Sequence, residues 1–186
     1  MIRIIAGEWR GRKLITPEGE ETTRPTSERT RETLFSMLTS RVGSFEDLRV
    51  ADLFAGSGAL GLEALSRGAA HCLLVEMAPP AIRAIRSNIA NLHAQARTDV
   101  RAASVMTLAA TKQPVDVLFL DPPYNTGAGA VAIDKLRRLG WIGEGTWVAL
   151  ETAATETPRI KGFVVDSERK VGKAKITLFK VEAEEV

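Results

Sequence analysis

The segment Asp121-Pro122-Pro123-Tyr124 carries the most distinctive chemistry in this sequence. It follows directly on an apolar run, residues 115–120, of the kind that forms a buried strand. Because proline has no backbone N–H, two prolines disfavour the regular structure that would occupy the neighbouring carbonyl groups. One strand end therefore offers a carboxylate, backbone carbonyl acceptors and an aromatic ring. The alternative is a structural turn with a cis-proline and a packed tyrosine.

A glycine-rich loop provides a second candidate site. Gly56, Gly58 and Gly61 satisfy the pattern G-x-G-x-x-G between an apolar run, residues 49–54, and a helical segment. Glycines let the backbone approach a ligand closely, and the N-terminus of the helix offers free N–H groups. Glu76 ends the next apolar run, where a carboxylate commonly binds ribose hydroxyl groups. This combination predicts a cofactor that contains a nucleoside.

The charge in front of this loop bears on the identity of the cofactor. NAD(P) would place its pyrophosphate at the helix N-terminus, where an additional carboxylate is unfavourable. Asp52 precedes the loop, and a carboxylate there suits a cationic ligand. S-adenosylmethionine carries both an ammonium and a sulfonium group, so we expect Asp52 to lie near the ammonium. The alternative role for Asp52 is a helix or loop cap.

The elements that must position these residues alternate between strand and helix, which predicts an α/β fold with a mostly parallel sheet covered on both faces. A short N-terminal hairpin and a helix precede this alternation, and an antiparallel pair of strands ends it. In such folds ligands bind outside the carboxyl ends of the strands. The predicted strands span residues 3–7, 12–16, 49–54, 71–76, 99–103, 115–120, 146–151, 162–171 and 175–181. The predicted helices lie within residues 22–38, 58–68, 79–92, 104–111 and 129–139.

The composition excludes several classes of protein. A chain of 186 residues with 45% hydrophobic residues and a net charge of +2 is typical of one soluble globular domain, residues 1–186. A single cysteine, Cys72, and two histidines argue against a disulfide framework and against a bound metal, and Cys72 lies in an apolar run. No segment approaches the ~18 apolar residues of a membrane span, and the start lacks the apolar centre of a signal peptide. We therefore expect a cytoplasmic protein with no membrane partner.

The motifs together resemble a known family. D-L-F-A-G-S-G, the acidic end of the second strand and D-P-P-Y resemble the class I S-adenosylmethionine-dependent methyltransferases that modify exocyclic amino groups of bases. The segments RIIAGEWRGRKL, TRPTSERTRETLFSML and DLFAGSGALGLEALSRGA are similar to the RsmD family, which methylates guanine N2 in small-subunit (16S) ribosomal RNA. The resemblance implies a Rossmann-like class I sheet, S-adenosylmethionine as cofactor, ribosomal RNA or the small ribosomal subunit as partner, and a monomer.

The resemblance also implies roles for individual residues. Catalysis falls to Asp121, Pro122, Pro123 and Tyr124. The cofactor contacts fall on Asp52, Phe54, Ala55, Gly56, Ser57, Gly58, Glu76, Met77, Ser104 and Val105. The family often has an aspartate near the adenine where this chain reads Ala103-Ser104-Val105, so Ser104 or the backbone of Val105 is expected there. The substrate contacts fall on Arg10, Arg12, Arg24, Thr26 and Arg29, and residues 1–24 then form a substrate-binding hairpin appendage.

A chemical role follows for the first segment. A base amine is a poor nucleophile because its lone pair is delocalised into the ring. Acceptors aimed at its two N–H bonds orient the nitrogen and favour its attack on the methyl group. Asp121 and the Pro122 carbonyl are the expected acceptors, and the Tyr124 ring is a surface on which a flipped base can stack. Trp9, near Arg10 and Arg12, could stack on RNA or cover the domain.

Two other functions fit part of the sequence. A DNA or RNA adenine-N6 methyltransferase would share D-P-P-Y, although the chain has no long insertion for a domain that recognises a DNA target. An NAD-type Rossmann protein would explain the glycines but not D-P-P-Y. Binding of S-adenosylhomocysteine rather than NAD would separate these classes.

Overall fold

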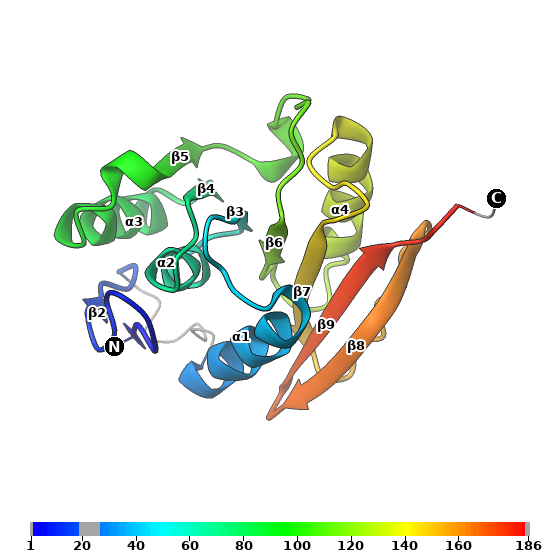
Figure 1. Cartoon of the computed structure of the whole chain (residues 1–186), viewed down its shortest axis with the longest axis horizontal. Coiled ribbons are helices and arrows are strands. Elements are labelled where there is room, and N and C mark those ends of the chain that lie inside the picture. The colour runs from blue at the N-terminus through cyan, green and yellow to red at the C-terminus, as the bar shows by residue number, and fades with distance from the viewer. Residues whose placement is uncertain (1, 19–26, 185–186) are drawn as a thin grey trace.

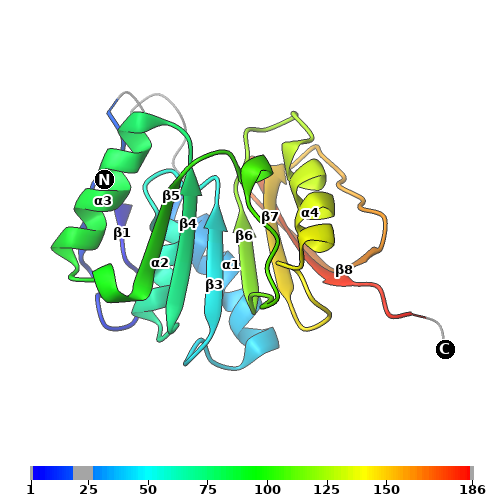
Figure 2. The same ribbon diagram turned by 90° about the horizontal axis from the view of Figure 1, so that it is seen from above.

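The central sheet contains seven strands. The computed structural model describes residues 2–18 and 27–184. The sheet runs through the middle of the molecule with the strand order β5-β4-β3-β6-β7-β9-β8 (Figures 1 and 2). Its strands are β3 (Arg49–Leu53), β4 (His71–Glu76), β5 (Thr98–Ala102), β6 (Val117–Leu120), β7 (Trp147–Ala153), β8 (Phe163–Val171) and β9 (Ala174–Val181). The strands β3 to β7 are parallel, whereas β9 is antiparallel to both β7 and β8. The predicted fold class is confirmed.

The order of the strands reverses at β3. The chain runs outward from β3 to β4 and β5, and then returns to the other side of β3 as β6. The loops that leave β3 and β6 therefore diverge, and in folds of this kind ligands bind at the carboxyl ends of two such strands. The glycine loop, residues 54–58, follows β3, and Asp121 follows β6. Both candidate sites thus lie at the topological switch point.

Helices cover both faces of the sheet. The helices α1 (Glu28–Val42), α2 (Ala59–Ser66) and α3 (Pro79–Asn91) pack on one face, and α4 (Ala128–Leu139) packs on the other. Figure 1 shows α1 and α4 on opposite sides of the sheet. Side chains alternate along β6, so Phe119 joins the core under α1 and α2 while Leu118 and Leu120 join the core under α4. Strands buried on both faces explain the continuous apolar runs in the sequence.

The N-terminal hairpin is short and packs into the first core. Its strands β1 (Ile2–Arg3) and β2 (Lys13–Leu14) pair over two residues each. Four of its apolar side chains are buried in the same cluster as α1, α2 and α3, namely Ile2, Ile4, Trp9 and Leu14. The hairpin is therefore bound to the sheet domain by an apolar face as well as by the chain connection.

A buried carboxylate ties this hairpin to two helices. Glu63 of α2 is fully buried and accepts hydrogen bonds from the backbone N–H groups of Ile5 (2.7 Å) and Ala6 (3.1 Å). It also receives the guanidinium groups of Arg31 at 3.4 Å and Arg67 at 3.0 Å. A buried charge is tolerated only when it is paired and hydrogen-bonded. Glu63 thus fixes the hairpin, α1 and α2 relative to one another.

The helix predicted at residues 104–111 is mostly wrong. Only a 3-10 turn, Val105–Thr107, forms there. Leu108 is extended and buried in the second core, the Trp141 indole donates to the Ala109 carbonyl, and the Thr111 N–H donates to the Leu139 carbonyl. These contacts with the end of α4 replace the intrahelical hydrogen bonds, so tertiary packing overrides the local helix preference.

The helices of residues 2–18 and 27–184 include none with the length and apolar character required to cross a membrane.

Candidate active site

The glycine loop is bent by three residues with left-handed backbone. Phe54 has a φ of 60°, Gly56 of 58° and Gly58 of 82°. Gly61 has a different task, because a Cβ added there would meet the Cys72 sulfur at 2.5 Å. That glycine lets α2 lie close against the strands, as the third glycine of the motif does in dinucleotide folds. Cys72 is fully buried as expected, so it is a core residue.

Glu76 organises the loop from the end of β4. One oxygen of its carboxylate accepts the Gly56 N–H at 2.9 Å. The other accepts the N–H groups of Met77 at 2.7 Å and Ala78 at 2.9 Å, and Ala78 caps α3. A carboxylate has acceptor sites for about four donors, so this one, with three backbone donors, can also receive a hydroxyl group. The carboxylate is thus held at the position where a ribose is expected.

Asp52 is buried beneath the loop. Its side chain is 1% exposed, and one oxygen accepts the Gly61 N–H at 2.8 Å. Burial raises the pKa of the Asp52 carboxyl well above its ordinary value, and the nearby charges of Asp121 and Glu76 raise it further. Asp52 therefore does act as a cap for the first turn of α2, which was the alternative role. Its contact with a cofactor ammonium stays a prediction.

The other expected cofactor residues surround the same strand ends. Ala55 and Ser57 are buried within the loop. The buried Asn88 amide of α3 donates to the Ser57 carbonyl at 3.0 Å and to the Ile15 carbonyl at 2.9 Å. Residue 15 follows β2, so one side chain links the hairpin to the glycine loop, a contact that the sequence did not reveal.

The expected cofactor residues Met77, Ser104 and Val105 lie after the ends of β4 and β5, and the last two are those expected near the adenine. Met77 is 64% exposed, and Val105 is buried. The Ser104 hydroxyl accepts the Met106 N–H at 3.1 Å, and the Ala103 N–H donates to the Glu76 carbonyl. Ser104 therefore caps its own turn, and it sits beside the strand end that carries Glu76.

The segment after β6 has an irregular backbone in which all peptide bonds are trans, as in the rest of the described chain. The cis-proline alternative is therefore wrong. Pro122 is buried and Pro123 is exposed, and the Thr126 hydroxyl donates to the Pro123 carbonyl at 2.8 Å. Asn125, with a φ of 58°, supplies the left-handed residue that closes the turn. We refer to residues 121–125 as the DPPY loop.

A carboxylate of β7 joins the DPPY loop, and it was not among the residues expected in the site. The Tyr124 hydroxyl donates to Glu151 at 3.0 Å. Glu151 is 5% exposed. In the sequence it ends an apolar run that predicts a buried strand, and an acid after such a run was the available signal. The register pairs Leu120 with Leu150, which places Asp121 and Glu151 side by side one residue further on.

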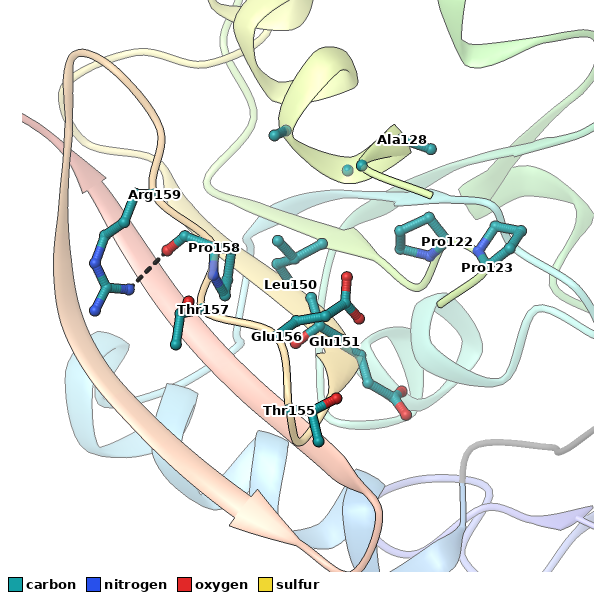
Figure 3. Close-up of a pocket in the computed structure, with 14 residues that line it drawn as sticks. Pro122, Pro123, Ala128, Leu150, Glu151, Thr155, Glu156, Thr157, Pro158 and Arg159 are labelled. Atoms are coloured by element: carbon teal, nitrogen blue, oxygen red, sulfur yellow. Dashed lines mark hydrogen bonds between the residues drawn. The ribbon is translucent and has the colours of Figure 1, made fainter. Parts of the chain in front are cut away.

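Two hollows adjoin this pair of strand ends. One, of about 380 Å³, lies between the DPPY loop with the start of α4 and the loop of residues 152–159. Figure 3 shows Pro122 and Pro123 on one side of it, Pro158 and Arg159 on the other, and the carboxylates of Glu151 and Glu156 between them. The second, of about 410 Å³, is lined by the start of α1, the β8–β9 turn and Glu151. Glu151 lines both hollows.

The expected RNA-contacting residues are dispersed. Arg10 is exposed near the hairpin turn, and Arg12 donates to the Asn91 carbonyl of α3 at 2.9 Å. Arg29 is exposed on the first turn of α1 and lines the second hollow. Arg24 and Thr26 lie outside the described residues. Trp9 is 7% exposed with the Arg97 guanidinium over its ring, so it covers the domain and does not present a face to RNA.

Comparisons with known proteins agree with this geometry. Residues 2–180 match the model of the family described as Conserved hypothetical protein 95. Ribosomal RNA small subunit methyltransferase D of Escherichia coli K12 is 40% identical over 151 residues, which cover 81% of this chain and 74% of that protein. The chain belongs to this family. The RsmD resemblance seen in the motifs and the prediction of a ribosomal RNA methyltransferase are therefore confirmed.

Solved structures extend the likeness to the whole fold of this family. The yhhF protein of Escherichia coli aligns with a TM-score of 0.84 at 37% identity and covers 98% of this chain and 99% of its own. An RNA methyltransferase from Salinibacter ruber, solved in complex with S-adenosyl-L-homocysteine, aligns with a TM-score of 0.69 over 88% of this chain and 97% of its own. Its identity is 13%, so that match shows the class I fold alone.

Proposed function

We propose that this chain transfers a methyl group from S-adenosylmethionine to the exocyclic N2 amine of a guanine in small-subunit ribosomal RNA. The observation that carries the proposal is the DPPY loop at the switch point, next to the glycine loop, with a trans backbone and a buried Pro122. Among the described residues none donates a hydrogen bond to the Pro122 carbonyl. The names of the relatives support ribosomal RNA as the substrate.

The residues around the glycine loop fit the proposed cofactor. A Cβ added at Gly56 would meet no atom within 4 Å, so a ligand can approach the backbone there. Asp52, Glu76 and Asp121 are close enough for the latter two to raise the pKa of Asp52, and three carboxylates in one place favour a cationic ligand. When bound, S-adenosylmethionine supplies a methyl group activated by a positive sulfur. Glu76 would receive the ribose hydroxyls, and Asp52 would lie on the ammonium side.

The DPPY loop would prepare the amine. Asp121 and the Pro122 carbonyl accept its two N–H groups, and this holds the nitrogen lone pair toward the methyl group. Methylation releases one proton from the amine, and the Asp121 carboxylate is the adjacent group that can take it. Tyr124 supplies the stacking surface for a base that has left its helix.

RNA would bind along the hairpin and the start of α1. The exposed Arg10 and Arg29 can meet phosphate, and Arg24 and Thr26 lie between them in sequence. The resemblance to the family also implies a monomeric enzyme. A ribosomal RNA substrate also supports a cytoplasmic location.

The decisive experiment compares ribosomal RNA from a strain lacking this protein with RNA from the complemented strain, by mass spectrometry of the nucleosides. One N2-methylguanosine should be lost and regained, and complementation with Asp121→Ala should fail. A change in N6-methyladenosine instead would move the chain to the adenine enzymes. Calorimetry that detects NAD binding but no S-adenosylhomocysteine binding would show that the chain is not a methyltransferase.

A further inference from the structure

The D-P-P-Y motif does not determine which base is methylated. The structure contains a side chain that can distinguish guanine from adenine and cytosine. Amines of adenine, cytosine and guanine are all planar and all present two N–H bonds. Asp121 and the Pro122 carbonyl accept such bonds without regard to the rest of the ring. Selection must therefore come from a group that meets the ring atom beside the amine.

We propose that Glu151 reads the N1–H of the target guanine and so restricts the enzyme to guanine. This inference rests on the proposed function, because it concerns the base whose amine Asp121 receives. Guanine carries a donor, N1–H, next to its N2 amine. Adenine and cytosine carry a ring-nitrogen acceptor next to theirs. A carboxylate accepts from the first and repels the other two.

The register places Glu151 where this contact is made. Leu120, the last residue of β6, pairs with Leu150 of β7, so Asp121 leaves β6 beside Glu151, which lies within β7. Phe119 and Ala149 face the α1 side of the sheet, and Leu120 and Leu150 face the α4 side. Alternation along β7 therefore directs Glu151 toward the α1 side. Asp121 is close enough to Asp52, the cap of α2 on that same side, to raise its pKa. Two acceptors side by side match two adjacent donors on one edge of a base.

A hollow adjoins Glu151 on that side. Its volume is about 410 Å³, and it is bounded by Glu151, by the N-cap Ser27, by Arg29 and Thr30 of α1, and by the β8–β9 turn. Its size lies within the range of about 300–1,000 Å³ that is usual for ligand pockets. The hydrogen bond from the Tyr124 hydroxyl to Glu151 joins the stacking ring to this wall.

The burial of Glu151 supports a recognition role. A carboxylate that is 5% exposed loses most of its hydration, so it depends on hydrogen bonds such as the one that the Tyr124 hydroxyl donates. Such a group discriminates strongly, because a ligand that places an acceptor against it leaves a buried charge facing a lone pair. The same carboxylate on an exposed surface would be screened by water.

The test uses RNA fragments that carry either guanosine or 2-aminopurine riboside at the mapped target position. 2-Aminopurine keeps the N2 amine but has an acceptor at N1. The wild-type enzyme should methylate guanosine about ten- to a hundred-fold faster than 2-aminopurine in single-turnover reactions. Glu151→Gln, whose amide can also donate a hydrogen bond, should lower this ratio about ten-fold or more. Glu156→Gln is the matched control in the neighbouring hollow, and it should keep the wild-type ratio.

The outcomes separate the two proposals. Wild-type enzyme that methylates both bases equally well overturns the role of Glu151, whether or not the variant folds. A Glu151→Gln enzyme that binds S-adenosylhomocysteine normally and keeps the wild-type ratio overturns it too, because a structural role lowers both rates together. Wild-type enzyme that methylates neither base, in free RNA or in RNA assembled into small ribosomal subunits, overturns the proposed function itself.

Discussion

The candidate active site has two halves, one at β3 and β4 and one at β6 and β7, and they are built in different ways. At the ends of β3 and β4 the side chains of Asp52 and Glu76 hold backbone N–H groups, namely those of Gly56, Gly61, Met77 and Ala78. At the ends of β6 and β7 the contacts run between side chains of distant segments, as from Tyr124 to Glu151. The first half is a backbone cradle fixed by local sequence. The second is an arrangement of side chains that depends on how the strands pair.

This difference implies different sensitivities to substitution. Changes in the β3–β4 half should affect cofactor affinity, whereas changes in the β6–β7 half should affect methyl transfer with the cofactor still bound. Substitutions in each half, measured by calorimetry with S-adenosylhomocysteine and by single-turnover methylation, test whether the two halves are separable.

The largest effect is expected for Asp121→Ala. This change removes an acceptor directed at the reacting amine, and such groups contribute about 3–4 kcal/mol, or roughly 10²–10³ in rate. Asp121→Asn keeps one acceptor oxygen and should lose less. Affinity for S-adenosylhomocysteine should change little in either variant. Near-normal single-turnover rates for Asp121→Ala would mean that the DPPY loop is only a turn.

Glu76→Ala should have the next largest effect, and on affinity for the cofactor. It removes the expected ribose contacts and also the acceptor for the N–H groups of Gly56, Met77 and Ala78. A loss of about 2–3 kcal/mol in binding of S-adenosylhomocysteine is expected. Glu76→Gln, which keeps one acceptor oxygen, should recover part of it. Unchanged affinity by calorimetry in Glu76→Ala would reject this placement of the cofactor.

Substitutions of Tyr124 should have a smaller effect on the β6–β7 half. From the sequence, Phe at this position is nearly silent if only the ring face counts. The structure shows in addition that the Tyr124 hydroxyl donates a hydrogen bond to the buried carboxylate of Glu151. Tyr124→Phe should therefore slow methyl transfer about ten-fold, because a hydrogen bond to a charged group contributes about 1.5–3 kcal/mol. Tyr124→Ala should be slower still, since it also removes a stacking surface of about 1–3 kcal/mol. A Phe variant at the wild-type single-turnover rate would show that Glu151 does not need the hydroxyl.

The strands and the glycine loop of the β3–β4 half could be predicted from the sequence because their signals are local. Glycines after a strand and an acid at the next strand end are all visible within one stretch of chain, whereas the cofactor contacts of these residues stay predictions. Glu151 was not visible, because an acid at the end of an apolar run becomes informative only once β6 and β7 are paired. The same reason applies to Asn88, whose partners lie 31 to 73 residues away in sequence, and to Glu63, whose partners Ile5, Ala6 and Arg31 lie 32 to 58 residues away. The failed helix at 104–111 also depended on distant contacts.

The smallest effect, and the one that probes the cradle most directly, concerns Asp52 and pH. Burial raises the pKa of the Asp52 carboxyl in the folded protein, so the folded state holds a proton that the unfolded state has lost. Stability then falls as pH rises above about 3.9, the ordinary value, until the raised pKa is passed. Asp52→Asn cannot ionise and keeps an acceptor for the Gly61 N–H. Relative to wild type, the variant should therefore gain stability with rising pH in that window, by at most about 1.4 kcal/mol per pH unit.

Thermal melts of both proteins at a series of pH values between 4 and 8 measure this difference, and the other ionisable groups cancel in the comparison. A difference that stays constant with pH would mean that Asp52 titrates as an ordinary carboxyl. A difference that moves in favour of wild type as pH rises would mean that the folded protein stabilises the charged form. Saturating S-adenosylhomocysteine sharpens the test, because an ammonium group beside Asp52 favours the ionised carboxylate. If the cofactor lies as proposed, it should reduce the pH dependence in wild type and leave the Asp52→Asn profile unchanged.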